Sequence, residues 1–133
     1  MVECLILGDS IAQGISTNRT ECQSWAQKGV SSYSWNNRNL HRNLSASTVV
    51  ISLGTNDGDH VNTFQEVLAL RQSVKAERVY WILPAIKPNV REIIKIVARS
   101  YEDTILEIPR LSKDHIHPTA NAYQELAERT RVK

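Results

Sequence analysis

The chain has 133 residues, of which 41% are hydrophobic and 23% are charged, and its formal net charge is +2. This size and balance predict one soluble globular domain over residues 1–133 and do not favour a second domain. The basic residues are scattered and the apolar runs are short, so neither nucleic acid nor a membrane is expected as a partner.

The first half of the chain predicts three strands. Residues 2–7 predict a short buried strand, which a Gly-Asp-Ser sequence at 8–10 interrupts before a short helical segment. A weaker strand is expected at 22–26, ended by Gly29 and a polar loop that reads Ser-Ser-Tyr-Ser-Trp. The β-branched run at 49–53 is the clearest strand of the three.

Helices and strands alternate in the second half. Residues 63–66 form a capping box that opens a helix, and residues 78–83 form an apolar strand. A second helix is expected from residue 89 and a fifth strand at 104–108. Pro118 stands where the first residue of a last helix is expected.

The strands are apolar throughout rather than alternating with polar residues. Such strands, when helices separate them, are typical of a parallel sheet that is covered on both faces. We therefore expect an α/β fold, a three-layer α/β/α sandwich around a sheet of about five parallel strands.

Polar residues and glycines follow the strands at the carboxyl edge of the predicted sheet. Ser10 follows the first strand, Gly29 the second and Asn56 the third, while residues 114–117 follow the fifth. Ligands of open parallel sheets bind at this edge, near the point where strand order reverses. If the first strand lies between the second and the third, Ser10, Gly29 and Asn56 become neighbours.

These residue types suit acyl transfer through a serine nucleophile. Ser10 would attack, and the oxyanion would be held by the backbone N–H groups of Ser10 and Gly29 and by the Asn56 amide. A serine hydroxyl needs a base within hydrogen-bond reach, and His117 is the candidate. Asp114, three residues earlier, can accept the Nδ1–H of His117 and fix its tautomer, as the acid of a catalytic triad does.

The same residues lie in four blocks that resemble a known family. The blocks "GDSIAQG", "QKGVSS", "GTND" and "DHIHPTANAYQELA" resemble, in order, those of the SGNH hydrolases, also called the GDSL esterases and lipases. The resemblance extends over nearly the whole chain. Two departures are visible: Ile11 stands where the family motif has leucine, and no asparagine directly precedes Gly29.

The resemblance implies a flavodoxin-like sandwich and a serine esterase that works through an acyl-enzyme. It assigns Ser10 as the nucleophile, Asp114 and His117 as the other members of the triad, and Ser10, Gly29 and Asn56 as the oxyanion hole. It implies no metal and no cofactor.

Other residues nearby have alternative readings. We expect His115 to be an exposed loop residue, and Asp9 and Asp57 to brace the loops rather than to react. Each block could also be a simple turn or helix cap, and the fold could serve as a catalytically silent binding module.

A metal-dependent hydrolase is the other enzymatic alternative. It takes His115, His117, Asp57, Asp59 and His60 as a zinc cluster. We rank it below the triad because it leaves the serine, the glycine and the asparagine without a role.

The loop after Gly29 carries Tyr33 and Trp35 among serines and asparagines, a combination that suits a sugar ring. The connections leave little material for a lid or an acyl tunnel. We therefore expect a small-molecule or carbohydrate ester as substrate, with removal of a small acyl group such as acetate. A lipid-directed esterase or lysophospholipase and a thioesterase are alternatives, and Trp35 could instead pack against its own segment.

The N-terminal sequence indicates the expected cellular location and, through it, the expected state of the two cysteines. No secretory signal is recognisable, which predicts the cytoplasm, with phage-associated or non-classical export as alternatives. Cys4 and Cys22 are then expected as reduced thiols, although a bond between neighbouring strands is conceivable.

Overall fold

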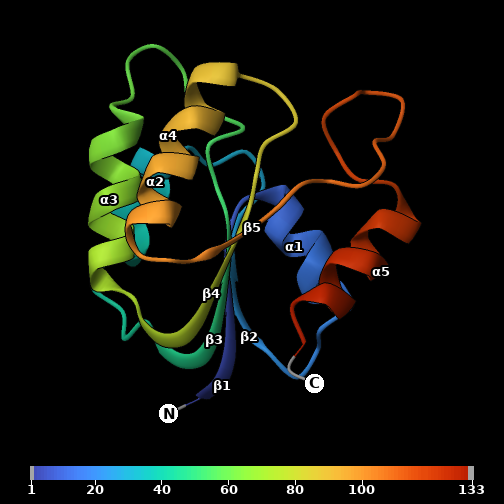
Figure 1. Ribbon diagram of the computed structural model, residues 1–133, viewed down its shortest axis with the longest axis horizontal. Coiled ribbons are helices and arrows are strands. Elements are labelled where there is room, and N and C mark those ends of the chain that lie inside the picture. Colours follow the sequence, from blue (N-terminus) through green and yellow to red (C-terminus); the bar gives the residue numbers. More distant parts are fainter. Residues whose placement is uncertain (1, 132–133) are drawn as a thin grey trace.

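The computed structural model describes residues 2–131, which form one sheet of five parallel strands with five helices around it (Figure 1). The strand order is β2-β1-β3-β4-β5, so β1 lies between β2 and β3 as in flavodoxin-like folds. This confirms the predicted α/β fold. In chain order the elements are β1 (Val2–Gly8), α1 (Ser10–Thr17), β2 (Gln23–Ala26), α2 (Ser32–Asn39), β3 (Ser45–Ser52), α3 (Thr63–Ser73), β4 (Lys75–Ile82), α4 (Pro88–Ser100), β5 (Thr104–Leu106) and α5 (Ala120–Arg129).

The helices cover both faces of the sheet. Figure 1 shows α1 and α5 on one side and α2, α3 and α4 on the other. Successive residues of a strand point to opposite faces, so Leu5 and Leu7 join the core beneath α2 to α4, while Ile6 joins the core beneath α1 and α5. The three-layer sandwich is therefore as predicted. Within residues 2–131, no helix combines the length and the apolar content that crossing a bilayer requires.

Helix α2 corrects the prediction of a polar loop. Ser31 caps it by accepting a hydrogen bond from the backbone N–H of Ser34 (3.1 Å). The side chain of Trp35 is fully buried and its indole N–H donates to the carbonyl oxygen of Trp25 (2.8 Å). Trp35 is the one buried apolar side chain of this helix, whose other buried residues are polar, so the segment has no apolar periodicity that would predict a helix.

Three helix starts also differ from the predicted ones. The cap of α3 is Asn62, whose side chain accepts a backbone N–H, so Thr63 is already helical. Helix α4 begins after Lys87, and α5 begins after Thr119 rather than at Pro118. Several residues near each start could have served as caps, and only the tertiary contacts choose between them.

The two cysteines form a disulfide, which corrects the expectation of reduced thiols. Cys4 lies on β1 and Cys22 directly precedes β2, and their Cα atoms are 4.9 Å apart. The expectation rested on the absence of a signal sequence, whereas the bond follows from the pairing of β1 with β2. The bond fastens the start of β2 to β1.

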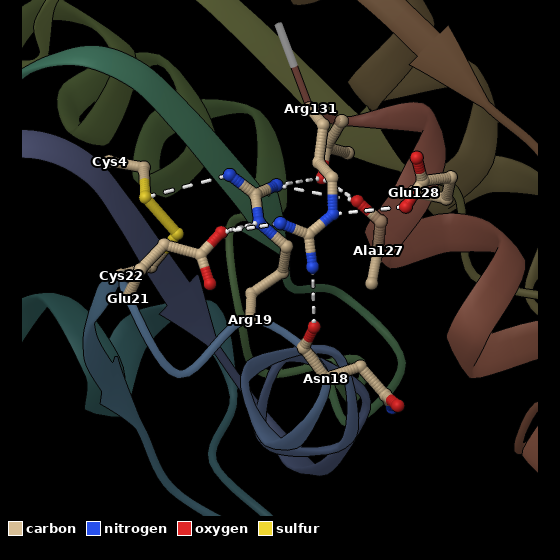
Figure 2. Close-up of polar contacts among 9 residues, drawn as sticks. Cys4, Asn18, Arg19, Glu21, Cys22, Ala127, Glu128 and Arg131 are labelled. Atoms are coloured by element: carbon tan, nitrogen blue, oxygen red, sulfur yellow. Dashed lines mark hydrogen bonds and ion pairs between the residues drawn. A yellow bond between two sulfur atoms is a disulfide. The ribbon is translucent and has the colours of Figure 1, made fainter.

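A buried arginine lies beside the disulfide (Figure 2). Arg19 is only 4% exposed and donates to the Thr130 hydroxyl (2.6 Å) and the Ala127 carbonyl oxygen (3.3 Å) at the end of α5. It also forms an ion pair with Glu21 (2.7 Å), which pairs in turn with Arg131 (2.8 Å). The network ties the segment after α1 to the end of α5.

Replacing both cysteines, Cys4→Ser with Cys22→Ser, is expected to lower the free energy of unfolding by about 3 kcal/mol, because the bond closes a loop of moderate length. Denaturant unfolding of the variant and of the wild type, with and without a reductant, measures the loss. Maleimide labelling in denaturant supplies the control: two adducts are expected only after reduction. Two adducts on unreduced wild-type protein would contradict the bond.

Candidate active site

The carboxyl ends of β1, β2 and β3 lie at the same level of the sheet. Gly8 at the end of β1 pairs with Ala26 on one side and with Ser52 on the other. From β1 the chain goes first to one side of the sheet and then to the other, so strand order reverses at this place. Ligands of such folds bind at this point.

Ser10 is the first residue of α1, immediately after this point. Asp9 caps the helix, accepting the backbone N–H of Ile11 (3.0 Å), and its own N–H donates to the Ser52 carbonyl oxygen (3.0 Å). A Cβ atom on Gly8 would lie 1.9 Å from that same oxygen. Only glycine allows this approach of β1 to β3, and the approach fixes where the Ser10 hydroxyl is presented.

The structure brings Ser10, His117 and Asp114 together. The Oγ of Ser10 lies 2.9 Å from the Nε2 of His117, across 107 residues of sequence. The Nδ1 of His117 lies 2.6 Å from the Oδ2 of Asp114. This is the hydroxyl, imidazole and carboxylate relay that a serine hydrolase needs.

Asp114 organises the loop that carries the histidine. Its Oδ1 accepts hydrogen bonds from the backbone N–H groups of His117 and Ile116 and from the Ser112 hydroxyl, each at 2.9 Å. The backbone N–H of His117 is the main cause of a pKa of the Asp114 carboxyl well below its ordinary value, followed by the His117 imidazole. The Asp114 carboxylate therefore stays ionised beside the imidazole at neutral and mildly acidic pH.

His115 does not join the relay. Its backbone has φ of 59°, in the left-handed region, and its side chain is exposed. The loop closes on itself, because the N–H of Ser112 donates to the His117 carbonyl oxygen (2.8 Å). His115 lies at the turn of this closed loop, in the exposed position that the sequence predicts for it.

Asn56 and Gly29 lie in adjacent loops. The Nδ2 of Asn56 donates to the carbonyl oxygen of Val30 (3.1 Å), the residue after Gly29. Gly29 has φ of +81°, and no atom lies within 4 Å of the place that a Cβ would occupy. Glycine is therefore required there for its backbone conformation, and the space in front of it is open to a substrate.

Asp57 links this pair of loops to three neighbouring helices. Its carboxylate accepts from the backbone N–H of Ser32 (2.7 Å) and from the hydroxyls of Ser32 (2.7 Å) and Thr63 (2.8 Å). The Lys87 ammonium donates to its carbonyl oxygen (2.7 Å). One buried residue thus connects the starts of α2, α3 and α4.

The residues of the zinc alternative do not converge. Among residues 2–131, the only group of three possible ligands from histidine, cysteine and acidic side chains is Cys4, Glu21 and Cys22, and its two sulfurs are bonded to each other. The carboxylate of Asp57 is already used by serine and threonine donors. The geometry does not fit a metal site built on His115 and His117.

Asp9 is fully buried next to Ser10, and burial raises the pKa of its carboxyl to about 6. Its Oδ1 accepts from Ile11 and from the Ser52 hydroxyl (3.2 Å), but its Oδ2 has no hydrogen-bond partner within the described residues. Burial, and then the charges of Asp9 and Asp114, also raise the pKa of Tyr123. The pKa of buried Asp9 is thus raised, whereas that of exposed Asp114 is lowered.

A hollow of about 600 Å³ lies between the starts of α3 and α4, and Asp57 is among its lining residues. Val90 and Ile93 give it an apolar side, and Asn62 and Lys87 a polar one. Its lining begins one residue after Asn56 in the chain.

Sequence reasoning missed the residues that hold these loops in place. Ser112 could have been found, because it lies two residues before Asp114 in the same loop. Ser32 and Thr63 carry no such signal, since each meets Asp57 only through the fold. The same holds for Lys87.

No family model matches the chain, and no curated protein matches it in sequence. Its fold resembles that of a proposed acylhydrolase from Bacteroides fragilis NCTC 9343, with a TM-score of 0.65 and 20% identity, over 96% of this chain and 83% of that one. It also resembles the C-terminal catalytic domain of peptidoglycan O-acetyltransferase A from Streptococcus pneumoniae, solved with a methylsulfonyl adduct. There the TM-score is 0.61 and the identity 16%, over 96% of this chain and 91% of that one. At these identities the likeness shows the fold alone.

Replacing Asp9 by asparagine is expected to change how stability depends on pH. Because folding raises the pKa of Asp9 to about 6, its contribution is fully present below about pH 4 and is lost as the pH rises through about 6. The wild type should therefore lose roughly 2 to 3 kcal/mol relative to Asp9→Asn between these limits. Denaturant unfolding across this pH range measures the difference, and parallel curves for the two proteins would contradict the buried carboxylate.

Proposed function

We propose that the protein is a serine esterase that hydrolyses carboxylic esters through an acyl-enzyme. The observation that supports this most strongly is the relay from Ser10 to His117 to Asp114, with heavy-atom distances of 2.9 and 2.6 Å. It joins residues from opposite ends of the chain at the edge where such folds bind ligands. The resemblance of the four sequence blocks to the SGNH hydrolases supports the same assignment.

In the proposed cycle, the Nε2 of His117 takes the hydroxyl proton while the Oγ of Ser10 attacks the ester carbonyl carbon. The tetrahedral intermediate collapses, and the alcohol leaves with the proton from His117. A water molecule then attacks the acyl-enzyme by the same route and restores the serine. Asp114 holds the imidazole in the tautomer with Nδ1–H and stabilises it when it is charged.

The oxyanion of each intermediate would be held by the backbone N–H groups of Ser10 and Gly29 and by the Asn56 amide. The hydrogen bond from Asn56 to Val30 orients the amide and leaves its second N–H for the oxyanion. The bonds of Asp57 to the starts of α2 and α3 hold these donors in place before the substrate arrives. This cycle uses no metal or cofactor.

The proposed substrate is a small acyl ester, with acetate as acyl group and a carbohydrate as alcohol. The site is shallow, since the side chains of His117 and Asp114 are 40% and 46% exposed, and an open site suits a bulky alcohol. Tyr33 is half exposed on α2 and can contact a sugar, whereas Trp35 is buried and cannot. One structural neighbour is an acetyltransferase of peptidoglycan, which is compatible with this choice.

Transfer of the acetyl group to a sugar hydroxyl is a second candidate, favoured by that same neighbour. The open site admits either water or a hydroxyl to the acyl-enzyme. Release of free acetate, compared with acetylated sugar when a sugar acceptor is added, distinguishes hydrolysis from transfer.

The disulfide bears on location. Disulfides persist in oxidising compartments and are rare in the cytoplasm. The bond between Cys4 and Cys22 therefore favours a location outside the cytoplasm. The N-terminal sequence alone predicts the cytoplasm. A thiol-labelling assay on protein taken directly from its host tests this, and free thiols there would contradict it.

Ser10→Ala and His117→Ala are each expected to lower kcat on p-nitrophenyl acetate at least about a thousandfold, because each removes a member of the relay. Asn56→Ala should cost about a hundredfold or more. A fluorophosphonate should label the wild type and not Ser10→Ala.

His115→Asn is the matched control for the histidines, since it removes an imidazole two residues away and asparagine tolerates the left-handed backbone. Its activity should stay close to that of the wild type. Full activity of the Ser10→Ala enzyme would contradict the serine esterase. A folded wild-type protein that the fluorophosphonate does not label would favour a binding module.

Acetyl esters are expected to be hydrolysed faster than octanoyl esters. Measurement of kcat/KM for p-nitrophenyl acetate and for p-nitrophenyl octanoate tests this, with the His117→Ala protein as the background. A marked preference for octanoate would favour the lipid-directed esterase or thioesterase and count against the acetyl group.

A further inference from the structure

Two hollows meet at one tryptophan on β2, the edge strand of the sheet. One has a volume of about 410 Å³ and lies toward the amino ends of the strands, and the other has about 240 Å³ and lies along α2. Trp25 and Arg42 line both. The two hollows therefore adjoin at these two residues, and together we call them the β2 groove.

Arg42 is held in a fixed position over this groove. Its guanidinium lies 3.6 Å from the centroid of the Trp25 ring, and its Nε donates to the Oδ1 of Asn39 (2.9 Å). Within residues 2–131 its two terminal amino groups have no hydrogen-bond partner. A guanidinium that is stacked and pinned through Nε presents these two groups for bidentate binding of a carboxylate.

The β2 groove is lined by basic side chains and by no acidic ones. Arg38, Arg42 and His41 line it, together with asparagine, glutamine and serine side chains, and no aspartate or glutamate does. Glu3, on the neighbouring stretch of β1, lines a different hollow with Arg19 and Arg131. The groove thus complements an anion without an acidic residue to repel it.

The β2 groove leads toward the proposed active site. Arg38 donates to the side-chain oxygen of Gln27, which lines the groove two residues before Gly29. The backbone N–H of Gln27 donates to the Gly8 carbonyl oxygen (2.9 Å), two residues before Ser10. A chain molecule lying in the groove would therefore continue toward the nucleophile.

We propose that the β2 groove binds an acidic polysaccharide, with Arg42 and Arg38 on its carboxylates and a sugar ring beside the part of Trp25 that Arg42 and the core leave exposed. The proposal rests on the serine esterase proposed above and names its substrate class: a uronic-acid polymer that carries acetyl esters. Amide and hydroxyl groups along the groove match sugar hydroxyls. A nucleic acid fits less well, because single-stranded binding sites use several stacked aromatic rings and the groove offers one.

Tryptophan fluorescence can report binding at this place. Trp35 and Trp81 are buried at 0% and 1% exposure, so iodide in solution should quench mainly Trp25. Alginate oligosaccharide, added to the Ser10→Ala protein, is expected to protect Trp25 from iodide. Affinity should fall as the salt concentration rises from about 0.02 to about 0.2 M, and dextran of equal length should give no protection.

Arg42→Gln is expected to weaken alginate binding about tenfold, while Arg99→Gln serves as the matched control. Arg99 is exposed on α4, away from β2, so its replacement removes the same charge and should leave the affinity unchanged. Trp25→Phe should retain the fold and lose the quenching signal. Equal binding by the Arg42 and Arg99 variants, equal binding of dextran, or tighter binding of single-stranded DNA in the groove would each overturn the proposal.

Kinetic measurements test the proposed groove separately from the proposed catalytic role of Ser10. On O-acetylated alginate, Arg42→Gln should lower kcat/KM about tenfold, mainly through KM, while its rate on p-nitrophenyl acetate stays that of the wild type. An equal loss on both substrates would show a structural effect and overturn the groove. If Ser10 is not the nucleophile, the Ser10→Ala enzyme will remain active on p-nitrophenyl acetate. That result does not depend on whether alginate binds.

Discussion

The close approach of β1 to β3 at Gly8 is the constraint on which the site depends. Gly8 has no Cβ, so its backbone can lie against the Ser52 carbonyl oxygen, and the N–H of Asp9 binds that oxygen. The end of β1 is thereby fixed relative to β3, and α1 must begin at Ser10. Because Asn56, the proposed oxyanion donor, follows β3, the same contact places it at one edge with Ser10, the proposed nucleophile. A side chain at position 8 would separate them.

Three aspartates each hold one part of the site, in three different surroundings. Asp9 caps α1, and its burial raises the pKa of its carboxyl. Asp57 is buried as well and accepts hydrogen bonds from serine and threonine donors at the starts of two helices. Asp114 is exposed and receives backbone N–H groups, so its pKa falls. Burial thus raises the pKa of Asp9, whereas hydrogen-bond donors lower that of Asp114.

The sequence carried the fold class and the positions of the chemistry, because buried strands and edge residues leave local patterns. It predicts Ser10, Asn56 and His117 at one edge of the sheet. It does not predict α2, whose one buried apolar side chain, Trp35, leaves no periodicity, or the disulfide, which depends on the pairing of β1 with β2. The contact of Thr63 with Asp57 likewise depends on how the loops pack. Long-range partners are therefore predictable from sequence where a sheet edge gathers them, as for Ser10 and His117, and not where only packing does.

The closed loop from Ser112 to His117 has a consequence for how the site forms. Asp114 and His117 are three residues apart and are arranged by hydrogen bonds within their own loop. Ser10 lies 107 residues away, so its contact with His117 forms only when distant parts of the chain have folded together. During synthesis on the ribosome the proposed nucleophile is made 107 residues before its proposed base. If the two act as proposed, turnover requires both the sheet and the loop before α5 to have formed, and the rate per mole of protein reports the folded fraction.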